Sequence, residues 1–194
     1  MFYNCISLES VDIPVSVESI GESAFFNCVK LESIDVSPEN KNFRSVDGVL
    51  FSADGKTLVR YPRFRDAESY RVPDGTEKIG AWAFGGCDAL KTVALPDGLT
   101  TLEHNAFAFC QALKSVELPA SLTTIDETAF WVCESLEAIE FPEGLTTIKR
   151  SAFSACKALK TVEFPASLRM VGAGAFSRCD LERVAFSEGL ETLG

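Results

Sequence analysis

The stretch AFAFCQALKSVELPASLTTIDET, residues 106–128, decides the fold because it recurs through most of the chain. Its opening pattern, a phenylalanine followed three positions later by a cysteine, returns every 23 residues except across one interval of 59. All cysteines of the chain occupy this slot: Cys5, Cys28, Cys87, Cys110, Cys133, Cys156 and Cys179. Self-similarity at a fixed period is the signature of stacked repeats. The 194-residue chain is therefore expected to hold seven copies of one unit, of which the first and last are incomplete.

Each unit predicts two short walls joined by corners. Leu113, Val116 and Leu118 are separated by polar residues and end in strict alternation, which is typical of a half-buried strand. Leu122 and Ile125 mark the opposite wall. A Ser, Asn or Thr precedes the Ala-Phe pair as a capping residue, which predicts one short helical turn there. These residues are Ser23, Asn105, Thr128 and Ser151. Because so small a unit cannot bury its apolar face alone, the units must stack.

The pattern A-F-x-x-C-x-x-L-x-x-V-x-x-P-x-x-L-x-x-I, at a period of 23, resembles the BspA-like branch of the leucine-rich repeats over essentially the whole chain. The resemblance implies one repeat solenoid over residues 1–194, built mainly from short β-strands with short helical turns in a curved, right-handed superhelical stack. It also implies a bacterial protein, secreted or on the cell surface, that serves in protein binding or adhesion. The family has no catalytic residues to carry over.

One segment of 36 residues, at about 37–72, interrupts the period. Val36 and Val72 hold the same strand slot on either side of it, so the chain is expected to leave the solenoid and re-enter at the equivalent place. Two β-rich runs, 49–51 and 58–61, flank an Asp-Gly turn and predict a β-hairpin. Because an isolated hairpin is marginally stable in water, this one should pack against a coil. The candidate anchors are Leu50, Phe51 and Tyr61.

The same segment differs in charge from the rest of the chain. Residues 37–72 carry seven basic and five acidic side chains, a net charge of +2. Because the whole chain has a net charge of −10, the remaining residues carry −12. Insertions in repeat proteins often mark the binding face. Four of its arginines are therefore expected to contact an acidic partner, either a foreign one or a second copy of this chain. This arginine group comprises Arg60, Arg63, Arg65 and Arg71.

A row of carboxylates is the second candidate surface. The outward position of successive strands holds Asp12, Asp35, Ala94, Glu117, Glu140, Glu163 and Ala185. We refer to Glu117, Glu140 and Glu163 as the acidic row. Like charges one coil apart, about 4.8 Å, destabilise a sheet, and Lys91, Lys114 and Lys160 are expected to compensate in part. The row is either a solvated charged face or a surface for a basic partner or a divalent cation.

Aromatic residues near the phenylalanine column are the third candidate. Trp82, Phe109 and Trp131 lie close to slots that hold Gly, Ser or Ala in other copies. They either pack laterally within the coils or form a contact surface for a partner.

Charge and hydropathy exclude other classes. A net charge of −10 argues against general nucleic-acid binding, which needs clustered basic residues. No apolar run reaches the ~18 residues of a membrane span, and MFYNCISLES at the start shows no signal peptide. Because the chain starts and stops within a repeat, a fragment or uncapped repeat segment is expected, and its bare ends make self-association plausible.

The remaining chemistry-bearing residues predict no enzyme, cofactor or metal. No two cysteines are closer than 23 residues, whereas metal sites need short paired spacing. Buried free thiols in one core slot are the favoured interpretation, and strained disulfides between coils are the alternative. The single histidine, His104, lies beside no nucleophile motif. The expected function is protein binding, and the alternative is a structural spacer within a larger cell-surface protein.

Overall fold

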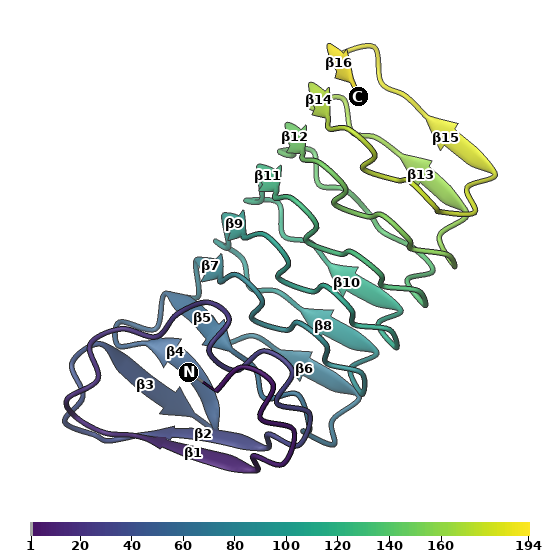
Figure 1. Cartoon of the computed structure of the whole chain (residues 1–194). Coiled ribbons are helices and arrows are strands. Elements are labelled where there is room, and N and C mark those ends of the chain that lie inside the picture. Colours follow the sequence, from purple (N-terminus) through teal and green to yellow (C-terminus); the bar gives the residue numbers. More distant parts are fainter. Residues whose placement is uncertain (1) are drawn as a thin grey trace.

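The computed structural model describes residues 2–194, which form a stack of short coils wound around one long axis (Figure 1). The stacked repeat solenoid predicted from the period is confirmed. Within residues 2–194 every regular element is a β-strand, and no helix is long and apolar enough to span a membrane.

One wall of the solenoid is a continuous sheet of nine strands, in the order β16-β14-β12-β11-β9-β7-β5-β4-β3. Its strands are β3 (Phe43–Val46), β4 (Val49–Ser52), β5 (Thr57–Arg60), β7 (Lys78–Ile79), β9 (Thr101–Leu102), β11 (Thr124–Ile125), β12 (Thr147–Ile148), β14 (Met170–Val171) and β16 (Thr192–Leu193). From β5 to β16 the pairing is parallel. Ile125 pairs with Ile148, its equivalent one repeat later, so each apolar slot stacks on itself.

The opposite wall consists of three shorter parallel sheets, β1-β2, β6-β8-β10 and β13-β15. Its strands are β1 (Ser10–Ile13), β2 (Ser33–Val36), β6 (Ser69–Arg71), β8 (Thr92–Ala94), β10 (Ser115–Glu117), β13 (Thr161–Glu163) and β15 (Arg183–Ala185). Between β10 and β13, residues 137–141 form no strand, so the wall is interrupted there.

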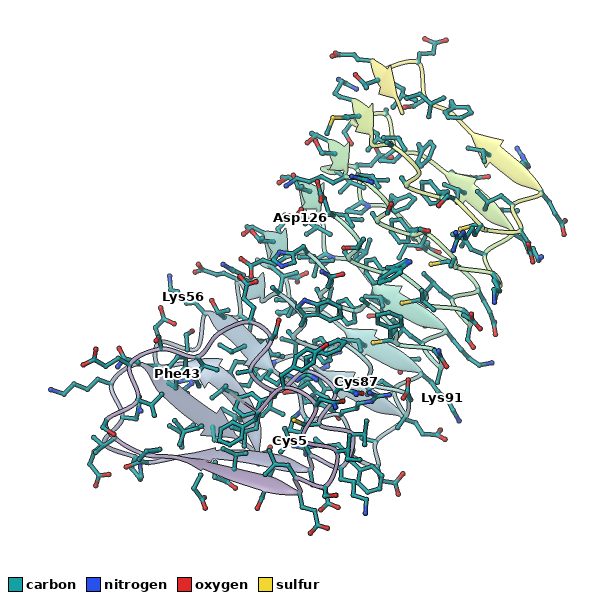
Figure 2. All side chains as sticks on the ribbon, in the orientation of Figure 1. Cys5, Phe43, Lys56, Cys87, Lys91 and Asp126 are labelled. Atoms are coloured by element: carbon teal, nitrogen blue, oxygen red, sulfur yellow. The ribbon has the colours of Figure 1, made fainter. Side chains whose placement is uncertain are left out.

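Stacked phenylalanines fill the centre of the coils. The rings of Phe84, Phe107, Phe130, Phe153 and Phe176 lie nearly parallel, with consecutive centroids 4.8, 5.1, 5.0 and 5.2 Å apart. These separations match the spacing of neighbouring strands, about 4.8 Å. Cys87 lies within the stack, whereas Lys91 extends from its outer side (Figure 2). The core is therefore built by identical side chains that meet their own equivalents.

The predicted helical turn is wrong in detail, because the Ala-Phe segment forms β-turns. Its backbone N–H groups alternate: those of Ala106 and Ala108 donate three residues back within the coil, whereas those of Phe107 and Phe109 donate to carbonyls of the next coil. Asn105, predicted as a helix cap, has a φ of 58°. This left-handed conformation ends any helix. Donation to the next coil thus replaces the intrahelical hydrogen bonds.

The interrupting segment contributes both a hairpin and a further coil. Strands β4 and β5 pair antiparallel, as the hairpin prediction required, and β3 pairs antiparallel with β4. The second half of the segment joins the parallel walls: β5 pairs with β7, and β6 pairs with β8 at an offset of 23. Tyr61 stacks on Phe84, 23 residues later, at 5.2 Å. Of the 36 extra residues, 23 therefore form an eighth coil and 13 (36 − 23) belong to the added strands.

Strand β4 joins two parts of the core. Val49 and Phe51 belong to the large cluster that runs through the stack, whereas Leu50 belongs to the small cluster beneath β1 and β2. Successive side chains of a strand point to opposite faces, which lets one strand serve both clusters. The expectation that the hairpin packs against a coil is confirmed, since Leu50, Phe51 and Tyr61 are all buried.

Candidate functional site

The acidic row lies exposed on the interrupted wall. Glu117 pairs in register with Ala94, which pairs with Arg71, and Glu163 pairs with Ala185. The outward column predicted from the sequence thus exists where strands are formed, and Arg71 is one of its members.

The expected compensation by lysines does not reach the acidic row. Lys114 forms an ion pair with Glu137 at 3.0 Å, and Lys160 lies 3.7 Å from Asp180. Lys91 pairs with Glu68. Each lysine reaches a carboxylate on a neighbouring coil. Within residues 2–194, the three glutamates of the row form no ion pair, so their charges stay uncompensated.

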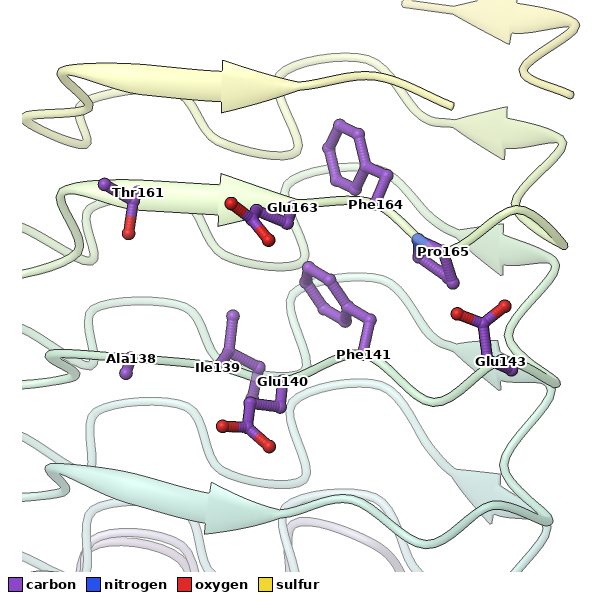
Figure 3. Close-up of a pocket in the computed structure, with 9 residues that line it drawn as sticks. All are labelled: Ala138, Ile139, Glu140, Phe141, Glu143, Thr161, Glu163, Phe164 and Pro165. Atoms are coloured by element: carbon purple, nitrogen blue, oxygen red, sulfur yellow. The ribbon is translucent and has the colours of Figure 1, made fainter. Parts of the chain in front are cut away.

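A groove of about 400 Å³ opens where the wall is interrupted (Figure 3). Glu140, Glu143 and Glu163 line it together with Phe141 and Phe164, whose ring centroids are 5.9 Å apart. Across residues 2–194, no group of three or more His, Cys, Asp or Glu side chains could hold a metal ion. The arrangement suits a cationic side chain, because both carboxylates and aromatic rings attract cations.

The arginine group is dispersed, which corrects the prediction of one basic surface. Arg60 is buried, with 3% of its surface exposed, and donates to the backbone carbonyls of Trp82 and Gly85. This burial lowers the pKa of Arg60. Arg63 forms an ion pair with Asp88 at 2.6 Å.

Arg65 and Arg71, the other two members, also lie apart. Arg65 donates to the carbonyl of Asp47, and its guanidinium lies over the ring of Tyr61, 5.6 Å from the centroid. Arg71 is exposed on the strand wall. The insertion therefore uses most of its arginines to hold its own coil in place.

The three predicted aromatic residues belong to a longer array, which we call the aromatic ridge. In order, its members are Tyr3, Phe26, Trp82, Phe109 and Trp131, with consecutive centroids 5.4, 4.5, 6.4 and 4.7 Å apart. The last four are half-buried and Tyr3 is exposed. Sequence reasoning missed Tyr3 and Phe26, although Phe26 occupies the same slot as Trp131.

Beside the ridge lies a depression of about 600 Å³, the turn-face pocket. Its lining includes Trp82, Trp131, Arg150 and Arg178. No pattern in the sequence marked these two arginines, because they come from different slots of different copies.

The cysteines form a column of free thiols. In six coils the Sγ atom donates to a backbone carbonyl 26 residues earlier, for example from Cys110 to Phe84 at 3.0 Å. Burial raises the pKa of Cys87 to about 12. Five of these thiols are buried and Cys5 and Cys179 are half-buried, in agreement with the favoured interpretation of free thiols in one core slot.

His104 lies at a contact between distant coils. Its Nε2 atom is 3.2 Å from a carboxylate oxygen of Glu22.

Solved structures similar to this chain are repeat proteins. A leucine-rich cell surface protein from Faecalibacterium prausnitzii is 34% identical, with a TM-score of 0.86 over 93% of this chain and 48% of its own. The pneumococcal vaccine antigen PcpA is 27% identical, with a TM-score of 0.81 over 96% of this chain and 46% of its own. A leucine-rich repeat protein from Bacteroides ovatus is 30% identical, with a TM-score of 0.65 over 97% and 45%.

The chain thus spans about half the length of these solved chains. No curated protein matches it by sequence. The pattern described as BspA type leucine rich repeat region matches residues 1–54 and 63–182, in six copies. On this match and on the geometry of its coils, the chain belongs to the BspA-type leucine-rich repeat family.

Proposed function

We propose that this chain is a non-enzymatic module that binds a basic protein through its repeat surface. The observation that carries the proposal is the acidic row: three exposed glutamates on one wall, left without ion pairs because the nearby lysines contact other carboxylates. Residues 1–194 act as one binding unit in this proposal.

A basic partner would gain from this arrangement in two ways. Carboxylates held on a stacked wall repel one another, and a cationic partner relieves that repulsion. The groove between Glu140 and Glu163 also places Phe141 and Phe164 beside the carboxylates, so that a Lys or Arg side chain would meet charge and aromatic surface together. Such binding is steered by charge and weakens with salt.

A non-enzymatic role agrees with the position of the single histidine. His104 contacts Glu22, a residue of a distant coil, so its imidazole serves the packing of the stack. The proposal includes a cell-surface or secreted location, supported by the likeness to the F. prausnitzii cell surface protein.

Capture experiments with matched charge variants test the proposal. The intact chain, the triple variant E117Q/E140Q/E163Q and the control E9Q/E18Q/E188Q are each immobilised and exposed to bacterial and host-cell surface extracts. The control removes three exposed charges elsewhere on the chain that form no ion pair within the described residues. We expect basic proteins that bind the intact chain and the control but are lost from the triple variant. Equal capture by all three chains would overturn the proposal.

The alternative function is a structural repeat segment of a larger cell-surface protein. It is supported by the length comparison, since the similar solved chains are about twice as long as this one. If the chain is a spacer, the intact chain and both variants should capture the same set of proteins. Replacing the chain within a larger protein by an equal number of unrelated repeats should then leave that protein's binding unchanged.

A further inference from the structure

The aromatic ridge is continuous although its members come from different slots. Phe26 and Trp131 directly follow the core phenylalanine of their coils, Phe109 lies two positions after it, and Trp82 lies two positions before it. Trp82 links the first two coils to the rest, because its ring lies 4.5 Å from Phe26 and 6.4 Å from Phe109.

Trp82 occupies a left-handed backbone position that smaller residues hold in other coils, namely Asn105, Thr128 and Ser151. Its φ is 59°, a left-handed conformation that bulky residues rarely adopt. Its ring covers Gly85, where a Cβ atom would lie only 2.8 Å from Cε3 of Trp82. The chain thus combines a strained tryptophan with a glycine to carry the aromatic surface across this coil.

The ridge ends at Trp131, where the turn-face pocket begins. In the next two coils the slot of Trp131 holds Ser154 and Ser177, whose hydroxyl oxygens are 2.9 Å apart. Small polar residues therefore follow a large ring, and the surface beside Trp131 is open.

Several polar side chains of this pocket are uncommitted. These residues are Asn105, Glu127, Arg150, Ser151 and Arg178. Their side chains form no hydrogen bond or ion pair with any residue of the described range 2–194. Arg150 and Arg178 are both exposed, and neither guanidinium group forms an ion pair within residues 2–194. The pocket thus offers donors, an acceptor and a local excess of positive charge.

The backbone of the same turns is already used. The N–H groups of Asn105, Thr128 and Ser151 donate to carbonyls of the following coil. A peptide strand cannot add to these turns by main-chain pairing, which is the usual source of affinity for extended peptides. Recognition here depends on side chains alone, from an indole, amide and hydroxyl groups and two arginines.

We propose that the turn-face pocket binds an acidic saccharide, one that carries the carboxylate of a uronic or sialic acid unit. Arg150 and Arg178 pair with the carboxylate, because the planar guanidinium matches it and donates two parallel hydrogen bonds. Trp131 supports the apolar C–H face of a sugar ring. Glu127 and Asn105 accept hydrogen bonds from its hydroxyl groups. The pocket is separate from the acidic row, so this activity is additional to binding of a basic protein.

Titrations with matched ligands test the proposal. The probes are trigalacturonate and 3′-sialyllactose, each with its methyl ester, which removes the charge and keeps the sugar. Binding to the intact chain is followed by the fluorescence of the two tryptophans and by the NMR signal of the Trp131 indole N–H. We expect at least one acid to bind weakly and its ester to bind about tenfold more weakly, as expected for the loss of a charged hydrogen bond.

Three variants locate the site. R150Q/R178Q should lower the affinity for the acid about tenfold and leave the ester unaffected, whereas the control R71Q/R183Q, two exposed arginines of the strand wall, should change neither. W131S, which copies the serine of the next two coils, should weaken acid and ester alike. Circular dichroism and thermal unfolding confirm that each variant is folded.

The remaining outcomes contradict the proposal. If neither acid binds, if acid and ester bind equally, or if the two arginine variants behave alike, the pocket is not an acidic-saccharide site. Binding of a hexaglutamate peptide without binding of either acid would replace the saccharide by an acidic protein segment. None of these results bears on capture through the acidic row, which has its own variants.

Discussion

The ring of Tyr61 stacks on Phe84 at 5.2 Å and thereby takes the place that phenylalanine holds in every other coil. It also meets Tyr70 edge-on at 4.8 Å. Tyr61 is buried, and its hydroxyl group has no hydrogen-bond partner within the described residues. One coil of the core therefore buries a hydroxyl group that forms no hydrogen bond within the described residues, which costs stability.

Substitutions at Tyr61 test this interpretation. Y61A removes a buried ring and should lower the free energy of unfolding by about 3–5 kcal/mol. Y61F keeps the ring and removes an unsatisfied hydroxyl, so it should be neutral or stabilising by about 1 kcal/mol. Urea unfolding measures both, and a Y61F chain clearly less stable than the parent would show that the hydroxyl has a partner.

Leu50 and Phe51 should have different effects on the two clusters of the core. L50A opens a cavity in the small cluster beneath β1 and β2, and should cost about 2–5 kcal/mol there. Amide hydrogen exchange should then accelerate in residues 10–36 more than in residues 92–171. F51A should show the reverse bias, because Phe51 belongs to the large cluster. Uniform acceleration in both variants would mean that the clusters unfold as one unit.

The thiol of Cys87 should make stability fall at high pH. Its pKa is raised by burial from 9.0 to about 12 in the folded chain. Above pH 9 the unfolded chain loses this proton while the folded chain keeps it, so the stability present below pH 9 is lost as the pH rises toward 12. The slope is about 1.4 kcal/mol per pH unit for one thiol.

The control for this prediction is C87A. Urea unfolding at several pH values should show a shallower loss of stability in C87A than in the parent, even though C87A is less stable at pH 7. Identical slopes for the two chains would mean that the thiol keeps an ordinary pKa.

Cys179, whose pKa is lowered chiefly by its hydrogen bond with Cys156, should react faster with iodoacetamide than Cys87 at pH 8.

Charge removal at Glu140 should stabilise the chain when no partner is present. Glu140 lines the groove with Glu143 and Glu163, and E140Q relieves this repulsion, by about 0.2–1 kcal/mol at low salt. This gain in stability should vanish in 1 M salt, because salt already screens the repulsion between the exposed carboxylates of the parent chain. E134Q is the contrasting variant: Glu134 is paired with Lys157 at 2.7 Å, so its loss should not stabilise. A gain that is independent of salt would exclude repulsion as its cause.

The repeat period by itself determined the stacked fold, the two walls and the cysteine column. The β-hairpin around residues 49–61 was predicted from two β-rich runs beside an Asp-Gly turn. In a stack of repeats, a residue type that returns every 23 positions packs against its equivalent in the next coil, so the sequence pattern predicts these core contacts. The same periodicity identified the outward position of the acidic row and three members of the aromatic ridge.

Only the tertiary structure decided the remaining features. The coil that contains Tyr61 has Phe64 in the cysteine slot and Ala67 in the following leucine slot, so its pattern is too altered to detect from the sequence. Arg60 lies in a β-rich run. That run predicts a strand, but it does not predict the direction in which the long arginine side chain points. The lysines pair with other carboxylates on neighbouring coils and not with the acidic row. A flexible lysine side chain can reach several carboxylates, so its partner depends on the three-dimensional geometry. A period tells which residues share a column, whereas contacts between columns depend on side-chain direction in three dimensions.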